Sequence, residues 1–255
     1  MENFTFCIPT NILFGKGQIE HLPEVIGQFG HQVLLVYGGG SVIDCAKAIA
    51  AGVCYPGDPW EMIATHAPLK KALPLVTVLT LAAAGSEADA GAVISNPDTK
   101  EKMALFDPAV FPRTSILDPQ YTFTVPVEQT AAGSIDILSH LMEQYFVPAS
   151  TFMGDLLVES VMKTVVKYAP LALAEPDNYE ARAQLMWAGT IADNATLCNG
   201  NQLAAFSCHA MEHELSAYYD VSHGVGLAII TPPLDGADTV RADGSSSGPF
   251  RQGGI

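Results

Sequence analysis

The chain has 255 residues, of which 49% are hydrophobic and 15% charged, and its formal net charge is −15 at pH 7. This length and composition allow one large core or two modest ones, which excludes a chain that is disordered throughout. The 12 basic residues are scattered among 27 acidic ones, and binding to a nucleic-acid backbone needs clustered Lys and Arg, so nucleic acid is excluded as a partner.

The five cysteines are odd in number and form no C-x-x-C pair. This favours a reducing compartment over a disulfide framework. The start of the sequence shows no basic segment followed by an apolar one, so no secretory signal is predicted. The apolar runs are too short to span a membrane. We therefore expect a cytoplasmic protein with no membrane partner.

The first third of the chain has the pattern of an α/β fold. The all-apolar, β-branched run at Gln32–Tyr37 predicts a strand buried in a parallel sheet. It leads through GGGS into a segment with helical spacing that ends at Gly52. Ser41, followed by Asp44 three residues later, predicts a capping box at the start of that helix. Further strands are predicted at Leu73–Ala82 and in TSILDP, which ends at Pro119.

Helical periodicity dominates from about Pro126 onward, where TFTVPVEQ offers a proline helix start. The segments EQTAAGSIDILSHLMEQYF, MGDLLVESVMKTVVKYAPLALA and YEARAQLMWAGTIADNATL all show it. The last stretch is rich in Gly, Ser, Pro and Asp without periodicity. We predict an α/β domain over residues 1–125, a helical domain over residues 126–231 and a disordered tail over residues 232–255.

A carboxylate and several histidines stand at helical spacing in two apolar segments. Asp136 and His140 are four residues apart, and so are His209 and His213, with His223 shortly after. Residues four apart share one face of a helix, and a buried Asp needs a positive partner. Three imidazoles and one carboxylate suit Fe²⁺ or Zn²⁺ and leave room for a substrate oxygen.

The spacing leaves alternatives open. Either segment alone also fits a hydrogen-bonded core histidine or a simple helix pair. The spacing does not decide which of His209 and His213 binds a metal.

The segments AAGSIDILSHLMEQYF and CHAMEHELSAYYDVSHGVGLAI resemble the metal-binding segments of the iron-containing (group III) alcohol dehydrogenases. VLTLAAAGSEADAGAVISN and ILDPQYTFTVP resemble the NADPH-dependent butanol dehydrogenase or aldehyde reductase branch of that family. The resemblance covers Met1 to about Thr231. It implies a Rossmann-like dinucleotide-binding domain followed by an all-α catalytic domain. It further implies that the metal ligands are Asp136, His140, His209 and His223, and that His213 lies beside the nicotinamide. The unperturbed pKa of histidine lies near neutrality, which makes His213 a candidate proton-relay group. The alternative is a hydrogen-bonded histidine that buttresses the helix.

A glycine turn between a strand and a helix is a possible phosphate site, because free N–H groups and the helix dipole favour anions. Here the turn consists of Gly38, Gly39, Gly40 and Ser41, although such glycines often only make a turn. The resemblance adds more distant residues as cofactor contacts. They are Thr80, Gly85, Ser86, Lys102, Tyr121 and Thr124.

The chain departs from the family pattern in three places. The family has two glycine turns and this chain has one, so a βαβ-sized piece of roughly 30 residues or more is missing between Tyr37 and Ser41. Ala84 replaces a threonine of the family's GTGSE turn. Beyond Thr231 the family continues with more helices. We therefore expect a shortened cofactor domain and a truncated helical domain whose apolar faces are covered in a homodimer or higher homo-oligomer.

The resemblance implies reversible hydride transfer between a primary alcohol or aldehyde and NAD(P)(H), with a divalent metal, Fe²⁺ or Zn²⁺, on the substrate oxygen. One alternative is a truncated relative that binds metal without dehydrogenase activity. Another is a metal-dependent hydrolase or lyase, for which the sequence offers no separate nucleophile or general base. A glycerol-type polyol dehydrogenase of the same superfamily fits LTLAAAGSE and the Asp-x3-His pair less well.

Overall fold

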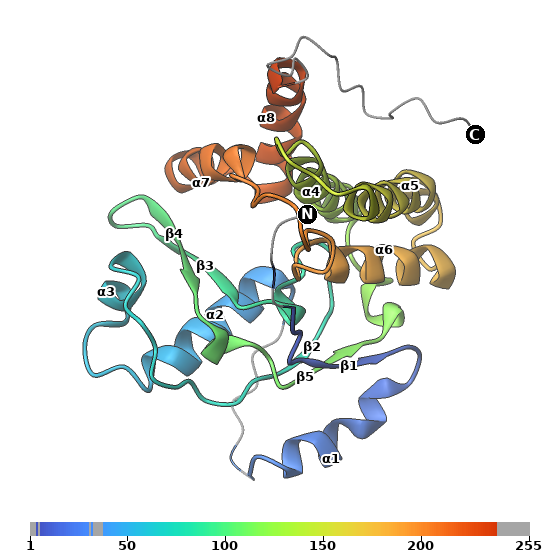
Figure 1. Ribbon diagram of the computed structural model, residues 1–255. Helices are drawn as coiled ribbons and strands as arrows, with labels where there is room; N and C mark the ends of the chain where they lie inside the picture. Colours follow the sequence, from blue (N-terminus) through green and yellow to red (C-terminus); the bar gives the residue numbers. More distant parts are fainter. Residues whose placement is uncertain (1–3, 5, 31, 33–37, 239–255) are drawn as a thin grey trace.

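The computed structural model describes residues 4, 6–30, 32 and 38–238. Short strands and helices alternate up to residue 122, and long helices follow (Figure 1). The elements of the first part are β1 (Asn11–Phe14), η1 (Gln18–His21), α1 (Leu22–Gly27), α2 (Gly40–Gly52), α3 (Pro59–Ala64), β2 (Val76–Val78), η2 (Ser86–Ala88), β3 (Gly91–Asn96), β4 (Glu101–Phe106), η3 (Pro108–Val110), β5 (Thr114–Leu117) and η4 (Pro119–Thr122). The second part consists of α4 (Val127–Tyr145), α5 (Phe152–Ala174), α6 (Tyr179–Ala192), α7 (Ser207–Tyr219) and α8 (His223–Asp238).

A parallel sheet with the order β1-β5-β2 forms the base of the first part. All four residues of β5 are buried, as the continuous apolar pattern of a central parallel strand requires. Ile43 of α2 and Met186 of α6 pack in one cluster with Leu117 of β5 and with Leu79, which directly follows β2. Helices and a parallel sheet thus share a core, and the predicted α/β class with a following helical part is confirmed.

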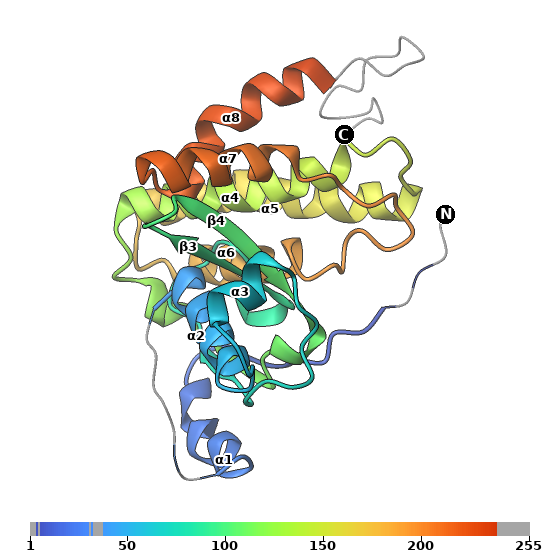
Figure 2. The same cartoon turned by 90° about the vertical axis from the view of Figure 1, so that its left-hand side faces the viewer.

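The antiparallel hairpin β3–β4 lies between α2 and α7 (Figure 2). Its strand β4 contacts α7, and its strand β3 packs on α2. The hairpin therefore joins the first part of the chain to the helices that carry the candidate metal ligands.

The long helices α4, α5 and α6 pack around one apolar cluster that includes Ile137, Leu141, Val158 and Leu185. α7 and α8 then lie across α4. Ser139 of α4 and Thr231 of α8 share a buried hydrogen bond of 3.0 Å. Within the described residues, none of the helices combines the length and apolar character needed to cross a bilayer.

Two local predictions differ from the structure, and a third falls outside the described residues. The N-cap of α2 is Gly39, so Ser41 lies inside the helix and no capping box forms. Asp44 instead accepts hydrogen bonds from Ser86 Oγ at 2.5 Å and Val93 N at 2.9 Å. The strand predicted at Leu73–Ala82 is only Val76–Val78, because the chain beyond Leu79 turns toward η2. The strand predicted at Gln32–Tyr37 falls on residues 33–37, which lie outside the described residues.

The predicted domain boundary near residue 126 coincides with the start of a helix, whereas the predicted boundary at residue 232 falls inside one. α4 begins at Val127 with Pro126 as its N-cap, consistent with a proline helix start. α8 continues to Asp238, into the stretch for which the sequence predicts an irregular tail. The tertiary contact of Thr231 with α4 holds this helix, and such contacts override weak local propensity. Residues 239–255 lie outside the described residues.

Candidate metal centre

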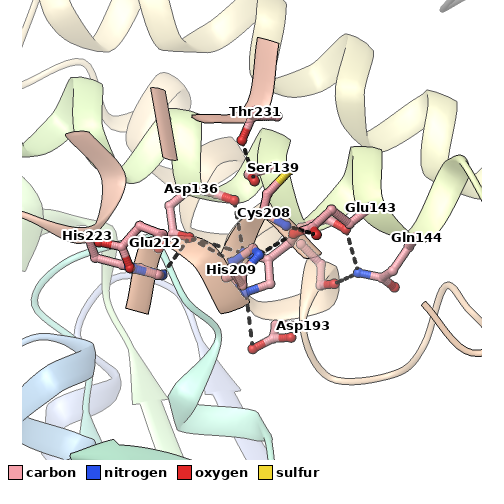
Figure 3. Close-up of polar contacts among 12 residues, drawn as sticks. Asp136, Ser139, Glu143, Gln144, Asp193, Cys208, His209, Glu212, His223 and Thr231 are labelled. Atoms are coloured by element: carbon pink, nitrogen blue, oxygen red, sulfur yellow. Dashed lines mark hydrogen bonds and ion pairs between the residues drawn. The ribbon is translucent and has the colours of Figure 1, made fainter. Parts of the chain in front are cut away.

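Three helices bring the predicted ligands to one place (Figure 3). α4 carries Asp136 and His140 one turn apart, and α7 carries His209 in its first turn. α7 ends at Tyr219, and its C-cap Asp220 has a left-handed backbone (φ 55) that turns the chain sharply. α8 then begins at His223. The turn places the first residue of α8 beside the ligand-bearing face of α4.

Asp136 Oδ1 lies at the middle of the cluster. It is 3.7 Å from His209 Nε2 and 3.7 Å from His223 Nε2. Asp136, His209 and His223 each offer a donor atom, and these atoms all lie within 4.8 Å of one another. This geometry distinguishes His209, whose ring is directed at Asp136, from His213 one turn later.

His140 is adjacent to this group but its ring is turned differently. Its Nδ1 lies 2.9 Å from the backbone oxygen of Asp136 and 3.1 Å from Asp136 Oδ1. Its Nε2 faces Asp193, with 3.6 Å to Oδ2. The structure therefore brings together three of the four predicted ligands, and it places the fourth in contact with Asp136 but with its second nitrogen toward Asp193.

The donor set fits a divalent cation. Asp136 Oδ1 and His209 Nε2 are both buried and have no hydrogen-bond partner. Leaving a buried polar atom unsatisfied costs about 1–3 kcal/mol, and a cation between these atoms would satisfy both at once. A carboxylate with imidazoles is a set that Fe²⁺ and Zn²⁺ accept.

The electrostatics of the cluster favour a positive charge at its centre. Burial raises the pKa of Asp136, but the neighbouring histidines, above all the charge of His140, outweigh it and hold this pKa well below its usual range. Burial lowers the pKa of His140, but Asp193 and Asp136 raise it to about 10. The Asp136 carboxylate therefore stays ionised and stabilises whatever cation lies beside it.

His213 lies one turn beyond His209 and, with Glu212 and His223, offers a second set of donor atoms within 4.8 Å of one another. Its ring centre is 5.5 Å from that of His223, and its side chain is half-buried. Burial, followed by the charges of Lys102 and His223, lowers the pKa of His213 to about 3. His213 is thus neutral at pH 7 and lies between the buried centre and the surface.

The predicted cofactor residues are distributed over several places. A cavity of about 550 Å³ lies between α1, α2 and β2, and Gly38, Thr80 and Tyr121 line it. Gly39 packs so closely against Leu81 that a Cβ atom added to the glycine would lie 3.0 Å from Leu81 Cβ. Gly40 lies beside Ala84. Ser41 and Thr124 are exposed.

Two more of these residues contact protein groups. Ser86 donates to Asp44, and the neighbouring Gly85 has a left-handed backbone (φ 64). Lys102 lies at the metal centre: its Nζ is 3.0 Å from Glu212 Oε2, 2.9 Å from Ser216 Oγ and 3.2 Å from His223 Nδ1. The structure thus places Lys102 with the candidate ligands and away from the residues that line the cavity.

Three acidic residues of the centre are absent from the sequence prediction. Glu143 contacts the ring of His209, Glu212 contacts the ring of His223, and Asp193 faces His140. Glu143 follows His140 by three residues and so shares its helical face, a signal that is visible in the sequence. Asp193 comes from the end of α6, and no spacing in the sequence relates it to His140.

Two family models match the chain. "Fe-containing alcohol dehydrogenase family, C-terminal" matches residues 130–243, and "Iron-containing alcohol dehydrogenase" matches residues 37–119. NADH-dependent butanol dehydrogenase A of Clostridium acetobutylicum is 41% identical, over 91% of this chain and 75% of the relative. The NADPH-dependent aldehyde reductase YqhD of Escherichia coli is 42% identical, over 95% of this chain and 78% of the relative.

The fold agrees with these matches. The crystal structure of NADH-dependent butanol dehydrogenase A from Thermotoga maritima superposes with a TM-score of 0.89 at 34% identity, covering 99% of this chain and 80% of that one.

The alignment with the Clostridium relative also contains a gap. It spans 291 positions, while 91% of 255 residues is about 232, so about 59 positions of the relative have no counterpart here. This agrees with a missing internal piece. The matches cover both the α/β and the helical part, and they include the segments with Asp136, His140, His209 and His223. The chain belongs to the iron-containing alcohol dehydrogenase family.

Proposed function

We propose that this protein is a metal-dependent alcohol dehydrogenase or aldehyde reductase that transfers hydride reversibly between a primary alcohol or aldehyde and NAD(P)(H). The observation that carries the proposal is the convergence of Asp136, His209 and His223, with two buried donor atoms that lack a partner. Similarity to butanol dehydrogenases and an aldehyde reductase supports this substrate class.

Asp136, His140, His209 and His223 would hold the metal. When bound, the cation supplies Lewis acidity at the substrate oxygen, and the nicotinamide supplies the hydride chemistry. Asp136 contributes the negative charge that favours the cation. Because Asp136 and His209 are buried, the centre also excludes bulk water, which strengthens these interactions.

His213 is proposed as the proton-relay group. A neutral imidazole has one nitrogen that accepts a hydrogen bond and one N–H that donates one, so the ring can pass a proton on by gaining it at one nitrogen while releasing one from the other as alcohol and aldehyde interconvert. The half-buried position allows the same ring to exchange that proton with solvent.

For the nicotinamide cofactor we propose the glycine turn Gly38–Gly40 and the cavity beside it. Thr80 and Tyr121 are the polar side chains among the predicted contacts that line this cavity. Both NADP(H) and NAD(H) fit, since the similar proteins include users of each.

We also propose that the protein is cytoplasmic and forms a homodimer or higher homo-oligomer. Phe152, Met153 and Leu156 of α5 are 80%, 61% and 47% exposed, and such apolar side chains are typical of a contact surface. A mass measured by light scattering during size-exclusion chromatography would test this, and a monomer mass would contradict it.

The experiment that tests the function measures metal content and turnover on the same protein. Purified protein is analysed for iron and zinc and assayed with butanal and either NADPH or NADH. We expect about one metal ion per chain and cofactor oxidation that depends on butanal. His209→Ala should lose both metal and turnover, whereas His21→Ala, at an exposed histidine of η1, should keep both.

A second candidate is a metal-binding relative without dehydrogenase activity. The gap of about 59 positions and the dispersal of the predicted cofactor residues favour it. Titration with NADPH, followed by its fluorescence, separates the two. Absence of binding at millimolar NADPH in metal-loaded protein would support this candidate and contradict the dehydrogenase.

A further inference from the structure

Two glutamates contact the Nδ1 atoms of two candidate ligands, His209 and His223. We infer that Glu143 and Glu212 are positioning residues of the metal centre, and that Lys102 fixes Glu212 in place. This inference rests on the metal centre proposed above and assigns roles to residues outside the ligand set.

An imidazole that binds a metal through Nε2 must carry its hydrogen on Nδ1. A carboxylate can only accept hydrogen bonds, so a carboxylate against Nδ1 selects this tautomer and fixes the plane of the ring. A histidine with a purely structural role needs no such arrangement, because it gains most when both nitrogens have protein partners.

Glu143 meets this requirement for His209. One carboxylate oxygen contacts His209 Nδ1, and the other accepts from the backbone N–H of Cys208 at 2.6 Å. The carboxylate thus also accepts from a backbone N–H in the first turn of α7. With Nδ1 held, His209 Nε2 points at Asp136 and has no hydrogen-bond partner.

Glu212 holds the Nδ1 atom of His223 in the same way. Its side chain is fully buried, and its Oε2 contacts His223 Nδ1. His223 Nε2 then lies 3.7 Å from Asp136 Oδ1, the same distance as for His209. The two rings, from α7 and α8, thus repeat one arrangement around one carboxylate oxygen (Figure 3).

Lys102 supports the second glutamate from the hairpin. Its Nζ donates to Glu212 Oε2 at 3.0 Å and to Ser216 Oγ at 2.9 Å. A buried carboxylate needs a positive partner to remain ionised, and Lys102 of β4 supplies it. The first part of the chain therefore contributes directly to the orientation of a ligand on α8.

The test measures metal affinity and not only turnover. Metal-free protein, prepared with a chelator, is titrated with Zn²⁺ against a competing fluorescent chelator. Replacing a partner of a metal-binding histidine typically lowers metal affinity about 10–100-fold. We expect a loss of this size in Glu143→Gln and in Glu212→Gln. Glu159→Gln is the matched control, because Glu159 of α5 accepts from Tyr145 Oη at 2.9 Å, outside the centre.

Lys102→Met decides between two roles for that residue. If Lys102 fixes Glu212, the Zn²⁺ affinity falls and NADPH binding stays within about twofold. If Lys102 contacts the cofactor instead, NADPH binding weakens while the Zn²⁺ affinity is unchanged, and this part of the inference is wrong. Binding of Co²⁺ adds a spectroscopic readout, since its visible absorption reports the geometry of the ligands.

The result that overturns the inference is Zn²⁺ affinity within twofold of wild type in both glutamine variants, while His209→Ala has lost the metal. The proposed function would then stand without these positioning residues. If the wild-type protein itself takes up no Zn²⁺ or Fe²⁺, the metal centre and the inference both fail. Because Glu143 also satisfies the start of α7, that variant can unfold; Glu212→Gln and Lys102→Met, which cap no helix, then carry the test.

Discussion

Gly224 lies directly against the backbone of Ala132, where α8 crosses α4. A Cβ atom at Gly224 would be 2.2 Å from the carbonyl oxygen of Ala132, far inside van der Waals contact. Only glycine permits this approach, and the approach brings the neighbouring His223 to Asp136. The close crossing of two helices is therefore part of how the metal centre is built.

This contact predicts the effect of Gly224→Ala. The added methyl group must push α8 from α4, and overpacking of this kind costs about 1–3 kcal/mol. We expect that loss in urea unfolding, together with weaker Zn²⁺ binding. Gly27→Ala in α1 is the control, because nothing lies within 4 Å of its Cβ position. Wild-type stability in Gly224→Ala would show that the helices do not need this approach.

The ionisation of Glu87 is expected to make the stability of the folded protein depend on pH. It is 2% exposed, and burial, opposed by a hydrogen bond from Thr190, raises its pKa from 4.5 to about 7. Between these values the folded protein binds more protons than the unfolded chain, so stability falls as pH rises from about 4.5 to 7. Above pH 7 the full cost is present, at about 1.4 kcal/mol for each unit of pKa.

Glu87→Gln should remove this cost, since an amide keeps an acceptor for the 2.5 Å bond from Thr190 Oγ1 and does not ionise. We expect the variant to be more stable than wild type at pH 8 and to show a flatter stability profile between pH 5 and 8. Urea unfolding across that range measures both quantities. Parallel profiles for the two proteins would mean that Glu87 titrates at its ordinary pKa.

We expect substitution of Lys47 to cause a large loss of stability. Its side chain is fully buried, and Nζ donates to Asp89 Oδ1 and to the Gly91 carbonyl oxygen, both at 2.6 Å. Lys47→Met would leave the Asp89 carboxylate unpaired, which typically costs about 3–5 kcal/mol. Thermal unfolding measures the loss. Adding Asp89→Leu to this variant should recover part of it, and no recovery would argue against the ion pair as the cause.

We expect substitution of Gly39 to weaken cofactor binding without changing metal binding. A side chain at this position would lie 3.0 Å from Leu81 Cβ, so Gly39→Val should displace the turn that precedes α2. We expect a higher KM for NADPH with bound metal unchanged, measured by steady-state kinetics and elemental analysis. A loss of metal in this variant would show that the turn serves folding and not the dinucleotide.

Periodicity was sufficient to predict α4 and α5, because each is amphipathic over many turns. The third predicted helix, residues 179–197, ends earlier, at Ala192 of α6. The segments predicted at 128–146 and 153–174 are α4 and α5 within one residue at each end. The hairpin β3–β4 is absent from the prediction, although Asn96 and Pro97 are typical turn residues between two alternating segments. A strand pair with mixed polarity gives a weaker signal than a long helix.

The spacing of Asp136 and His140 in an apolar helix indicated a metal site, and the resemblance selected His209 over His213 as a candidate ligand. The supporting groups were not predictable, since their roles depend on tertiary contacts. Lys102 shows the difference: the resemblance places it with the cofactor, and the structure places its Nζ 3.0 Å from Glu212, 110 residues away in the chain. Long-range pairs of this kind leave no periodic pattern in a sequence.

The candidate ligands lie on helices that are far apart in the chain, since Asp136 precedes His223 by 87 residues. An ion held by both would act as a cross-link that exists only in the native state. At a free metal concentration 100 times Kd, such binding adds about 2.7 kcal/mol to stability. We therefore expect cells grown in metal-poor medium to contain less of this protein, and not merely the same amount in an inactive form, because proteases remove unfolded chains.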